Sequence, residues 1–299
     1  MATSISIGTS QSFELIRSQL DKEFDMLHHE GIDISLAETS LGNYKFLNCS
    51  MGRTVKPEQE MVLKHYVANA VSDFILNHWE NLILRKIIRE HYYYLTKEEK
   101  ENVVEKAVKI LEASLRPGDN DFYMYRLNRK SKILHKVLDY LSLNSKINID
   151  GFIKFRLQDY VDDLHHILEQ AVDELMLEKE YHEFIMLLKY FVDIQEPRAE
   201  KIHVLLLSGG SFQLFDDNHR VVNNEFLEGC IVEMVDNEIN YEDLLISALI
   251  TIAPKEVVMH IPESCKAINT VKTIEGVFGE RAVLCYGCSL CGRQNQKKH

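Results

Sequence analysis

The sequence predicts a mainly helical α+β protein, with a central helical bundle between an N-terminal α/β segment and a C-terminal mixed-sheet α/β domain. Apolar residues recur every three or four positions from about Pro57 to Gln195, which is the period of a helix. Before and after that stretch they alternate with polar residues, as in strands. The chain has 299 residues, which is beyond the size at which a single core usually stops growing. We therefore predict three parts, residues 1–55, 56–198 and 199–299.

Residues 1–55 have the pattern of a strand, a helix and two further strands. Ser4 to Ile7 alternates polar and apolar residues, and apolar residues then follow at helical spacing from Phe13 until Gly31 ends the helix. The segments Ile32–Leu36 and Tyr44–Cys49 alternate again. These strands could form a small domain or join a sheet formed elsewhere in the chain.

The middle of the chain has the signals that begin and end helices. Pro57 suits a first helical position, and Thr96 with Glu99 three residues later has the pattern of a capping box. Arg116-Pro117-Gly118-Asp119 breaks the helix that follows. The segment from Phe152 to Ile194 is the longest periodic stretch. Helices so close in sequence should pack as an antiparallel bundle.

After Pro197 the pattern predicts a meander and then a strand–helix–strand unit. The meander comprises His203–Leu207, Phe212–Phe215 and Arg220–Val222; the later unit comprises a strand at Val257–Ile261, a helix at Glu263–Phe278 and a strand at Arg281–Tyr286. A crossover helix between two strands predicts that they are adjacent and parallel. Their carboxyl ends then meet at one edge of the sheet, where ligands of such sheets bind.

Charge and composition exclude several classes of protein. The net charge of −12 and the pI near 5.6 argue against binding to nucleic acid, which needs a basic surface. They also disfavour a polybasic membrane anchor, and the longest apolar runs are too short to span a bilayer. The N-terminus lacks the basic start and apolar core of a signal peptide. Six cysteines, half of them clustered, suit a reducing compartment, so we expect a cytoplasmic protein.

The cysteine cluster is the one place where reactive side chains converge in the sequence. Cys285, Cys288 and Cys291 are separated by gaps of two residues, a spacing with which cysteines bind zinc or an iron–sulfur cluster. Three ligands leave such a site one short, and Cys265 or His260 could complete it because the parallel strands bring their carboxyl ends together. Cys230 is a further candidate, without an argument for its placement. An open fourth position is the alternative.

The same cysteines could instead form a thiol-redox pair or an iron–sulfur redox centre. The usual activated thiol lies at a helix N-terminus, whereas only the short polar tail Gly292–His299 follows the cluster. Ser208–Ser211 resembles a phosphate-binding loop, but it lacks the lysine and the following helix, so we interpret it as a hairpin turn. The sequence has no hydrolase, metalloprotease, Walker or dinucleotide motif. We therefore expect no catalytic residues and favour a non-enzymatic, regulatory protein.

Two surfaces could contact a partner. The basic cluster Arg126, Arg129, Lys130, Lys132 and Lys136 could hold an anion, but we expect it to pair with the acidic stretch 151–200. The aromatic groups Tyr92–Tyr94 and Phe122–Tyr125 could contact another protein, although core packing is the commoner use of such residues.

The sequence resembles a known family over about residues 150 to 291. The similarity lies in Gly151–Tyr160, Ala171–Glu174, Glu178–Tyr181, Glu183–Val192, Asp243–Pro254 and the closing Cys285-x-x-Cys288-x-x-Cys291. These segments resemble the YtxC family of sporulation proteins from endospore-forming Firmicutes. The resemblance implies a cytoplasmic, sporulation-associated protein with no established enzymatic activity and no catalytic residues to transfer.

Overall fold

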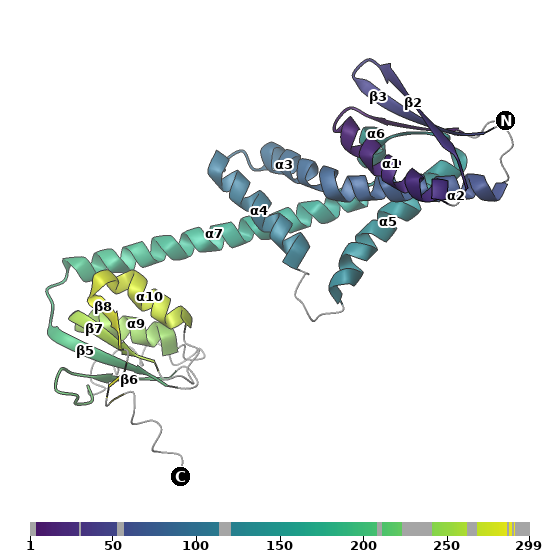
Figure 1. The fold of residues 1–299 in the computed structure, drawn as a ribbon. Coiled ribbons are helices and arrows are strands. Elements are labelled where there is room, and N and C mark those ends of the chain that lie inside the picture. Colours follow the sequence, from purple (N-terminus) through teal and green to yellow (C-terminus); the bar gives the residue numbers. More distant parts are fainter. Residues whose placement is uncertain are drawn as a thin grey trace, which may run out of the picture. The chain divides into compact units, whose positions relative to one another are not determined.

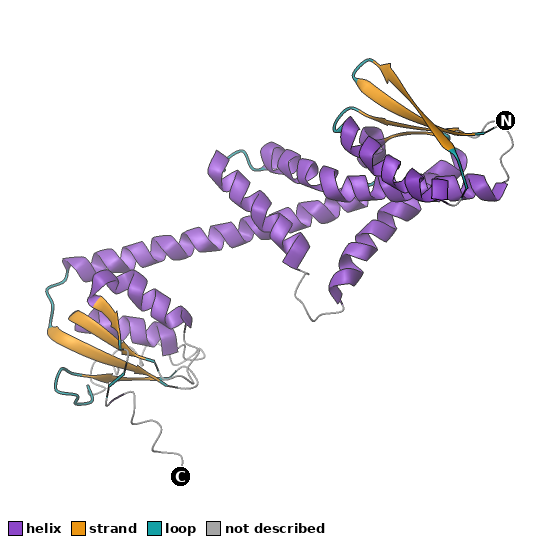
Figure 2. Ribbon diagram, in the orientation of Figure 1, coloured by secondary structure: helices purple, strands orange, loops and turns teal. Residues whose placement is uncertain are grey.

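The chain forms two compact units, Met1–Met176 and Leu177–His299. The computed structural model describes residues 4–29, 31–52, 57–113, 121–207, 211–222, 241–261, 268–285, 287–288 and 290. Helices predominate, and each unit contains a four-stranded mixed sheet (Figure 1, Figure 2). The predicted mainly helical α+β class is confirmed, while the division into three parts stays a prediction.

The sheet of the first unit combines the N-terminal strands with one from the middle of the chain. Its strands are β1 (Ser4–Thr9), β2 (Ile34–Leu41), β3 (Tyr44–Met51) and β4 (Lys146–Asn148), in the order β2-β3-β1-β4. β3 is antiparallel to β1 and β2, whereas β4 is parallel to β1 and places Ile147 opposite Ile7. Both isoleucines are buried, so burial of apolar side chains holds the inserted strand in place. The N-terminal strands therefore join a sheet of their own unit.

The helices of the first unit share one hydrophobic core with that sheet. They are α1 (Phe13–His29), α2 (Pro57–Phe74), the π-helical segment η1 (Ile75–Trp79), α3 (Glu80–His91), α4 (Lys97–Ala113), α5 (Asp121–Leu143) and α6 (Ile149–Arg156). The predicted capping box is confirmed at the start of α4. The Thr96 N–H donates to Glu99 Oε2 at 2.8 Å, and the Glu99 N–H donates to Thr96 Oγ1 at 3.2 Å.

The helix predicted from Phe152 to Ile194 is divided in the structure. α6 ends at Arg156, and α7 (Gln158–Ile194) begins after Leu157, whose backbone (φ −110°, ψ 33°) is not helical. The sequence did not reveal this break because Leu157 is buried and fits the apolar period. The first half of α7 contributes to the core of the first unit and the second half to that of the second.

The second unit contains the strand–helix–strand unit that the sequence predicts. Its elements are β5 (Ala199–Leu206), β6 (Phe212–Phe215), α9 (Tyr241–Ile252), β7 (Pro254–His260), α10 (Ile268–Phe278), the short 3₁₀ helix η3 (Gly279–Arg281) and β8 (Ala282–Leu284), with sheet order β6-β5-β7-β8. β7 and β8 are adjacent and parallel, with Val257 opposite Ala282, so that prediction is confirmed. The third segment of the predicted meander, Arg220–Val222, pairs with β6 through an antiparallel bridge between Val221 and Phe215, and the Val222 N–H donates to the Leu214 carbonyl at 3.0 Å. It forms a single bridge and not a full strand within the described residues. Residues 208–210, 262–267 and 286 lie outside the described ranges.

The two faces of the second sheet have different roles. Strand residues alternate between faces, and Val204, Val257 and Met259 pack with α9, α10 and the second half of α7. His203 and Leu205 belong to the opposite face, where Leu205 and Phe215 contact the buried Leu290. In the part of the chain that is described, no helix combines the length and apolar character needed to cross a bilayer.

Candidate metal centre at the edge of the second sheet

The topology of the second sheet brings His260 and the two described cysteines of the cluster together. His260 is the last residue of β7, and Cys285 follows β8 directly. The Cys285 N–H donates to the Met259 carbonyl at 2.8 Å, which extends the strand pairing by one residue. Leu290 packs against Leu205 and Phe215, so this residue lies against the face of the sheet that carries His260. Parallel pairing and this apolar anchor together position Cys288.

The spacing of the three side chains suits a metal ion. One donor atom from each of His260, Cys285 and Cys288 lies within 4.8 Å of the others. His260 Nδ1 is 3.4 Å from Cys288 Sγ. In tetrahedral zinc sites, bonds of about 2.0 Å to nitrogen and about 2.3 Å to sulfur place two such ligands roughly 3.5 Å apart. The donor atoms are therefore close to a ligating arrangement. His260 is buried, Cys285 is half-buried and Cys288 is exposed, so an ion could enter from the solvent side.

His203 fixes the orientation of the His260 ring. Its Nδ1 lies 3.0 Å from His260 Nε2. When His260 Nδ1 presents its lone pair to the cysteines, Nε2 carries the proton and donates to His203. An outer partner of this kind sets the tautomer of a metal-binding histidine. The exposed His219 ring lies 4.8 Å from the His203 ring and continues the cluster toward solvent.

The surroundings keep His260 neutral. Burial, followed by the neighbouring His203 and His219, lowers the pKa of His260 to about 4. Burial is also the largest cause that lowers the pKa of His203, with His219 and Lys201 acting in the same direction. A neutral imidazole is the form that binds a metal, whereas an activated thiolate in a redox pair needs a cation beside it. The electrostatics therefore fit a metal ligand better than a thiolate–imidazolium pair.

The structure describes some of the predicted site residues and not others. His260, Cys285 and Cys288 converge as the strand order predicts, while Cys265, Cys291 and Cys230 lie outside the described residues. Metal binding by this set stays a prediction. His203 was not among the residues predicted for the site. Its signal was a histidine within the otherwise apolar run 202–206 of β5, two residues before Leu205 on the same face.

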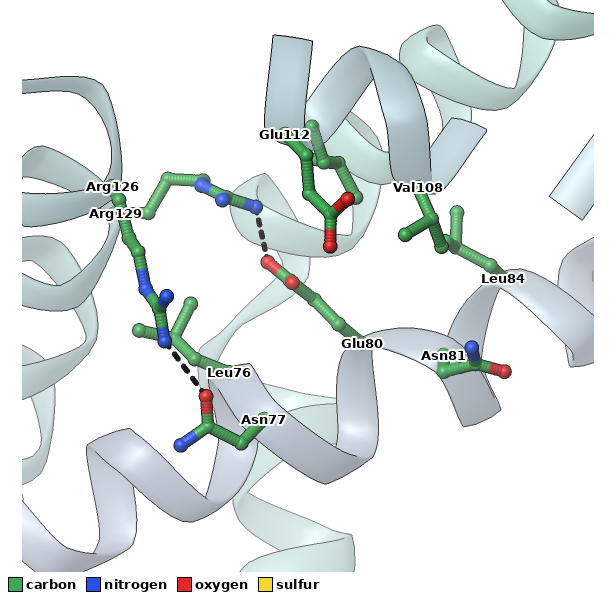
Figure 3. A pocket seen from close by; sticks show the side chains of 10 residues that line it. Leu76, Asn77, Glu80, Asn81, Leu84, Val108, Glu112, Arg126 and Arg129 are labelled. Atoms are coloured by element: carbon green, nitrogen blue, oxygen red, sulfur yellow. Dashed lines mark hydrogen bonds and ion pairs between the residues drawn. The ribbon is translucent and has the colours of Figure 1, made fainter. Parts of the chain in front are cut away.

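A second polar cluster, partly buried, lies in the helical part of the first unit. A cavity of about 330 Å³ is lined by residues of η1, α3, α4 and α5 (Figure 3). At its wall the Glu80 carboxylate accepts hydrogen bonds from Arg129 and Tyr160, and Arg126 donates to Asn77 Oδ1 at 2.8 Å. Burial raises the pKa of Glu80, although Arg129 and Tyr160 oppose this effect. The Glu80 carboxylate and the Asn77 amide oxygen each meet a donor from another helix, so the cluster is suited to holding helices together.

The fold and the site define a mainly helical α+β protein whose second sheet presents a histidine–cysteine group at the carboxyl ends of two parallel strands. The sequence model of the YtxC-like family matches residues 65–283, so the chain belongs to this family. The matched range includes His203 and His260 and ends before Cys285.

The chain is also similar to the protein named "Uncharacterized protein YtxC" of Bacillus subtilis (strain 168). The two are 28% identical over 228 residues, which cover 73% of this chain and 76% of the relative. No solved structure matches the chain. The family resemblance deduced from the sequence is thereby confirmed.

Proposed function

We propose that this is a non-enzymatic, regulatory protein of the cytoplasm, associated with sporulation, that binds one metal ion at the edge of its second sheet. His260, Cys285 and Cys288 are three of the ligands, and Cys291 or Cys265 is the fourth. The observation that carries the proposal is the convergence of the three described donor atoms within 4.8 Å.

The donor chemistry supports a metal, and zinc in particular. Thiolates crowded beside a neutral imidazole repel one another unless a cation neutralises them. Mixed nitrogen and sulfur ligands are typical of structural zinc sites, whereas most iron–sulfur clusters are held by cysteines alone. A closed site of four protein ligands would fasten the C-terminal segment to the sheet and leave no position for a substrate. The proposed role is therefore structural or regulatory.

Anaerobic purification of the full chain distinguishes zinc from a redox centre. We expect colourless protein in which Cys285 and Cys288 resist alkylation until a chelator removes the metal. Cys49 serves as the internal standard, because burial raises the pKa of its thiol to about 12 and so keeps it unreactive in the folded chain. A brown protein with reducible absorption bands would favour the iron–sulfur alternative. Rapid alkylation of both cysteines in freshly purified protein, with Cys49 still protected, would overturn metal binding.

The link to sporulation rests on the family resemblance and needs its own test. In the host that encodes the chain, we expect deletion of the gene to lower the yield of heat-resistant spores. Reintroduction of the wild-type gene should restore that yield, and a Cys288→Ser version should restore it less well. Equal yields from the deletion and parent strains would refute a role in sporulation while leaving metal binding to be judged separately.

A further inference from the structure

The last part of α7, from Phe184 to Ile194, is apolar on nearly every side. Lys189 and Asp193 are its only charged residues. Asp193 pairs with Arg281 of its own unit, so its charge is directed toward that unit. A helix that is apolar all round is normally buried all round. We therefore expect each side of this segment to pack against another surface.

One side of the segment is already covered. Ile185 and Val192 are buried in the core of the second unit. Gly276 of α10 allows this close packing, because a Cβ at that position would come within 2.9 Å of Ile185 Cγ2. Nearly one turn before Gly276, Thr273 Oγ1 lies 2.8 Å from the Tyr181 hydroxyl of α7. The contact between α7 and α10 is thus specific and leaves the opposite side of α7 outside the core.

The opposite side, which we call the outer face of α7, exposes large apolar side chains. The residues on this face are each between 44% and 61% exposed to solvent. They are Phe184, Met186, Leu187, Tyr190, Phe191 and Ile194. With about half of each side chain exposed, the face presents roughly 600 Å² of apolar surface. Monomeric proteins rarely leave a contiguous patch of more than a few hundred Å² uncovered.

The spacing on the outer face matches that of a helix that pairs with another helix. Phe184, Leu187, Phe191 and Ile194 are separated by three, four and three residues. This is the spacing of the apolar seam in coiled coils, in which each helix buries such residues against its partner. Two copies of a patch of this size would bury an area close to that of a standard stable interface.

We propose that the outer face of α7 pairs with the same face of a second copy of this chain. An apolar seam without charges is self-complementary, so a twofold arrangement places like residues against like without opposing equal charges. A membrane surface fits less well, because the net charge of −12 disfavours approach to anionic lipids. The outer face of α7 contains none of the proposed metal ligands, so pairing through this face does not depend on the proposed function.

The test is the mass of the full-length protein in solution, measured by light scattering after gel filtration and by sedimentation over a wide range of concentrations. We expect a dimer for the wild type and a monomer for both Leu187→Glu and Phe191→Glu. Neither residue belongs to the core of the second unit, so the two variants should keep the wild-type circular dichroism spectrum. The matched control is Phe155→Glu on α6, where the phenylalanine is 67% exposed, and this variant should stay dimeric.

Three results would overturn the proposal. The first is a wild-type chain that is monomeric at every concentration. The second is a dimer that both Leu187→Glu and Phe191→Glu leave intact. The third is a monomer that floats with anionic vesicles and loses this binding in the Leu187→Glu variant, which would assign the face to a lipid surface. If one glutamate variant fails to fold, the other and the concentration dependence of the wild type still decide the question.

Discussion

Each unit has a polar cluster with at least one buried member, and the two clusters differ in the chemistry of the groups that they bring together. In the first unit the Glu80 carboxylate accepts from Arg129 and Tyr160, so donors face acceptors and the charges balance. In the second unit one possible metal-ligand atom from each of His260, Cys285 and Cys288 lies within 4.8 Å of the others. Burial of polar groups alone therefore does not indicate a ligand site. Convergence of several groups that are all metal ligands does, because one cation can satisfy all of them together.

The largest predicted effect is a loss of stability in the first unit, caused by substitution of Arg129. Arg129→Met should lower the free energy of unfolding by about 3–5 kcal/mol, because it leaves the Glu80 carboxylate buried without its counter-ion. Urea unfolding followed by the fluorescence of Trp79, the only tryptophan, measures this in the unit concerned. The control is Arg126→Met, one turn earlier on α5, which should cost about 0.5 kcal/mol or less because Arg126 is exposed. Similar losses in both variants would show that the Arg129–Glu80 pair does not hold the helices together.

The second prediction concerns His203 and is tied to the proposed metal site. His203→Leu should weaken zinc binding about 10- to 100-fold, because His260 loses the acceptor that fixes its tautomer. His203→Gln keeps a hydrogen-bond acceptor and should retain more of the affinity. Competition with a chromogenic chelator measures both.

The matched control for His203 is His219→Asn. The His219 ring contacts the His203 ring, but the side chain is exposed and is outside the converging donor group. Asparagine also tolerates its positive φ of 58°. This variant should bind zinc as the wild type does. If His203→Leu did so as well, His203 would have no part in orienting the ligand.

The smallest predicted effect is a pH dependence that belongs to Glu80. Because burial raises the pKa of Glu80, the folded chain holds this proton more tightly than the unfolded chain does. The associated stabilisation is complete below the ordinary pKa of 4.5 and is lost as the pH rises through the raised value. Glu80→Gln cannot titrate, so the unfolding free energy of wild type relative to this variant should fall with rising pH, by at most about 1.4 kcal/mol per pH unit. If the unfolding free energy of wild type relative to Glu80→Gln instead grew with rising pH, Arg129 would lower the pKa of Glu80 by more than burial raises it.

Local patterns in the sequence predicted much of the second unit. Alternation on both sides of a helical stretch predicted the parallel pairing of β7 and β8, and this pairing placed His260 and Cys285 at one edge. The capping box at Thr96 is also a local pattern. Such features follow from residues a few positions apart, so periodicity and spacing suffice to identify them.

Features that depend on distant contacts were missed or only partly predicted. β4 has three residues, too few to show alternation, and only its pairing with β1 makes it a strand. The basic cluster does pair with the 151–200 stretch through Lys136 and Asp159 at 2.5 Å, but Arg129 pairs with Glu80 and Lys130 with Asp73. Those partners are far away in sequence, so only the folded helices reveal them.

The metal content of the full-length protein tests the central claim most directly. Anaerobically purified wild type and His219→Asn, analysed by inductively coupled plasma mass spectrometry, should each contain one zinc ion per chain. His260→Gln and Cys288→Ser should contain almost none while they keep the wild-type circular dichroism spectrum. Wild-type protein without stoichiometric zinc or iron, or variants at His260 and Cys288 that retain the full metal content, would contradict the assignment of this histidine–cysteine group as a metal site.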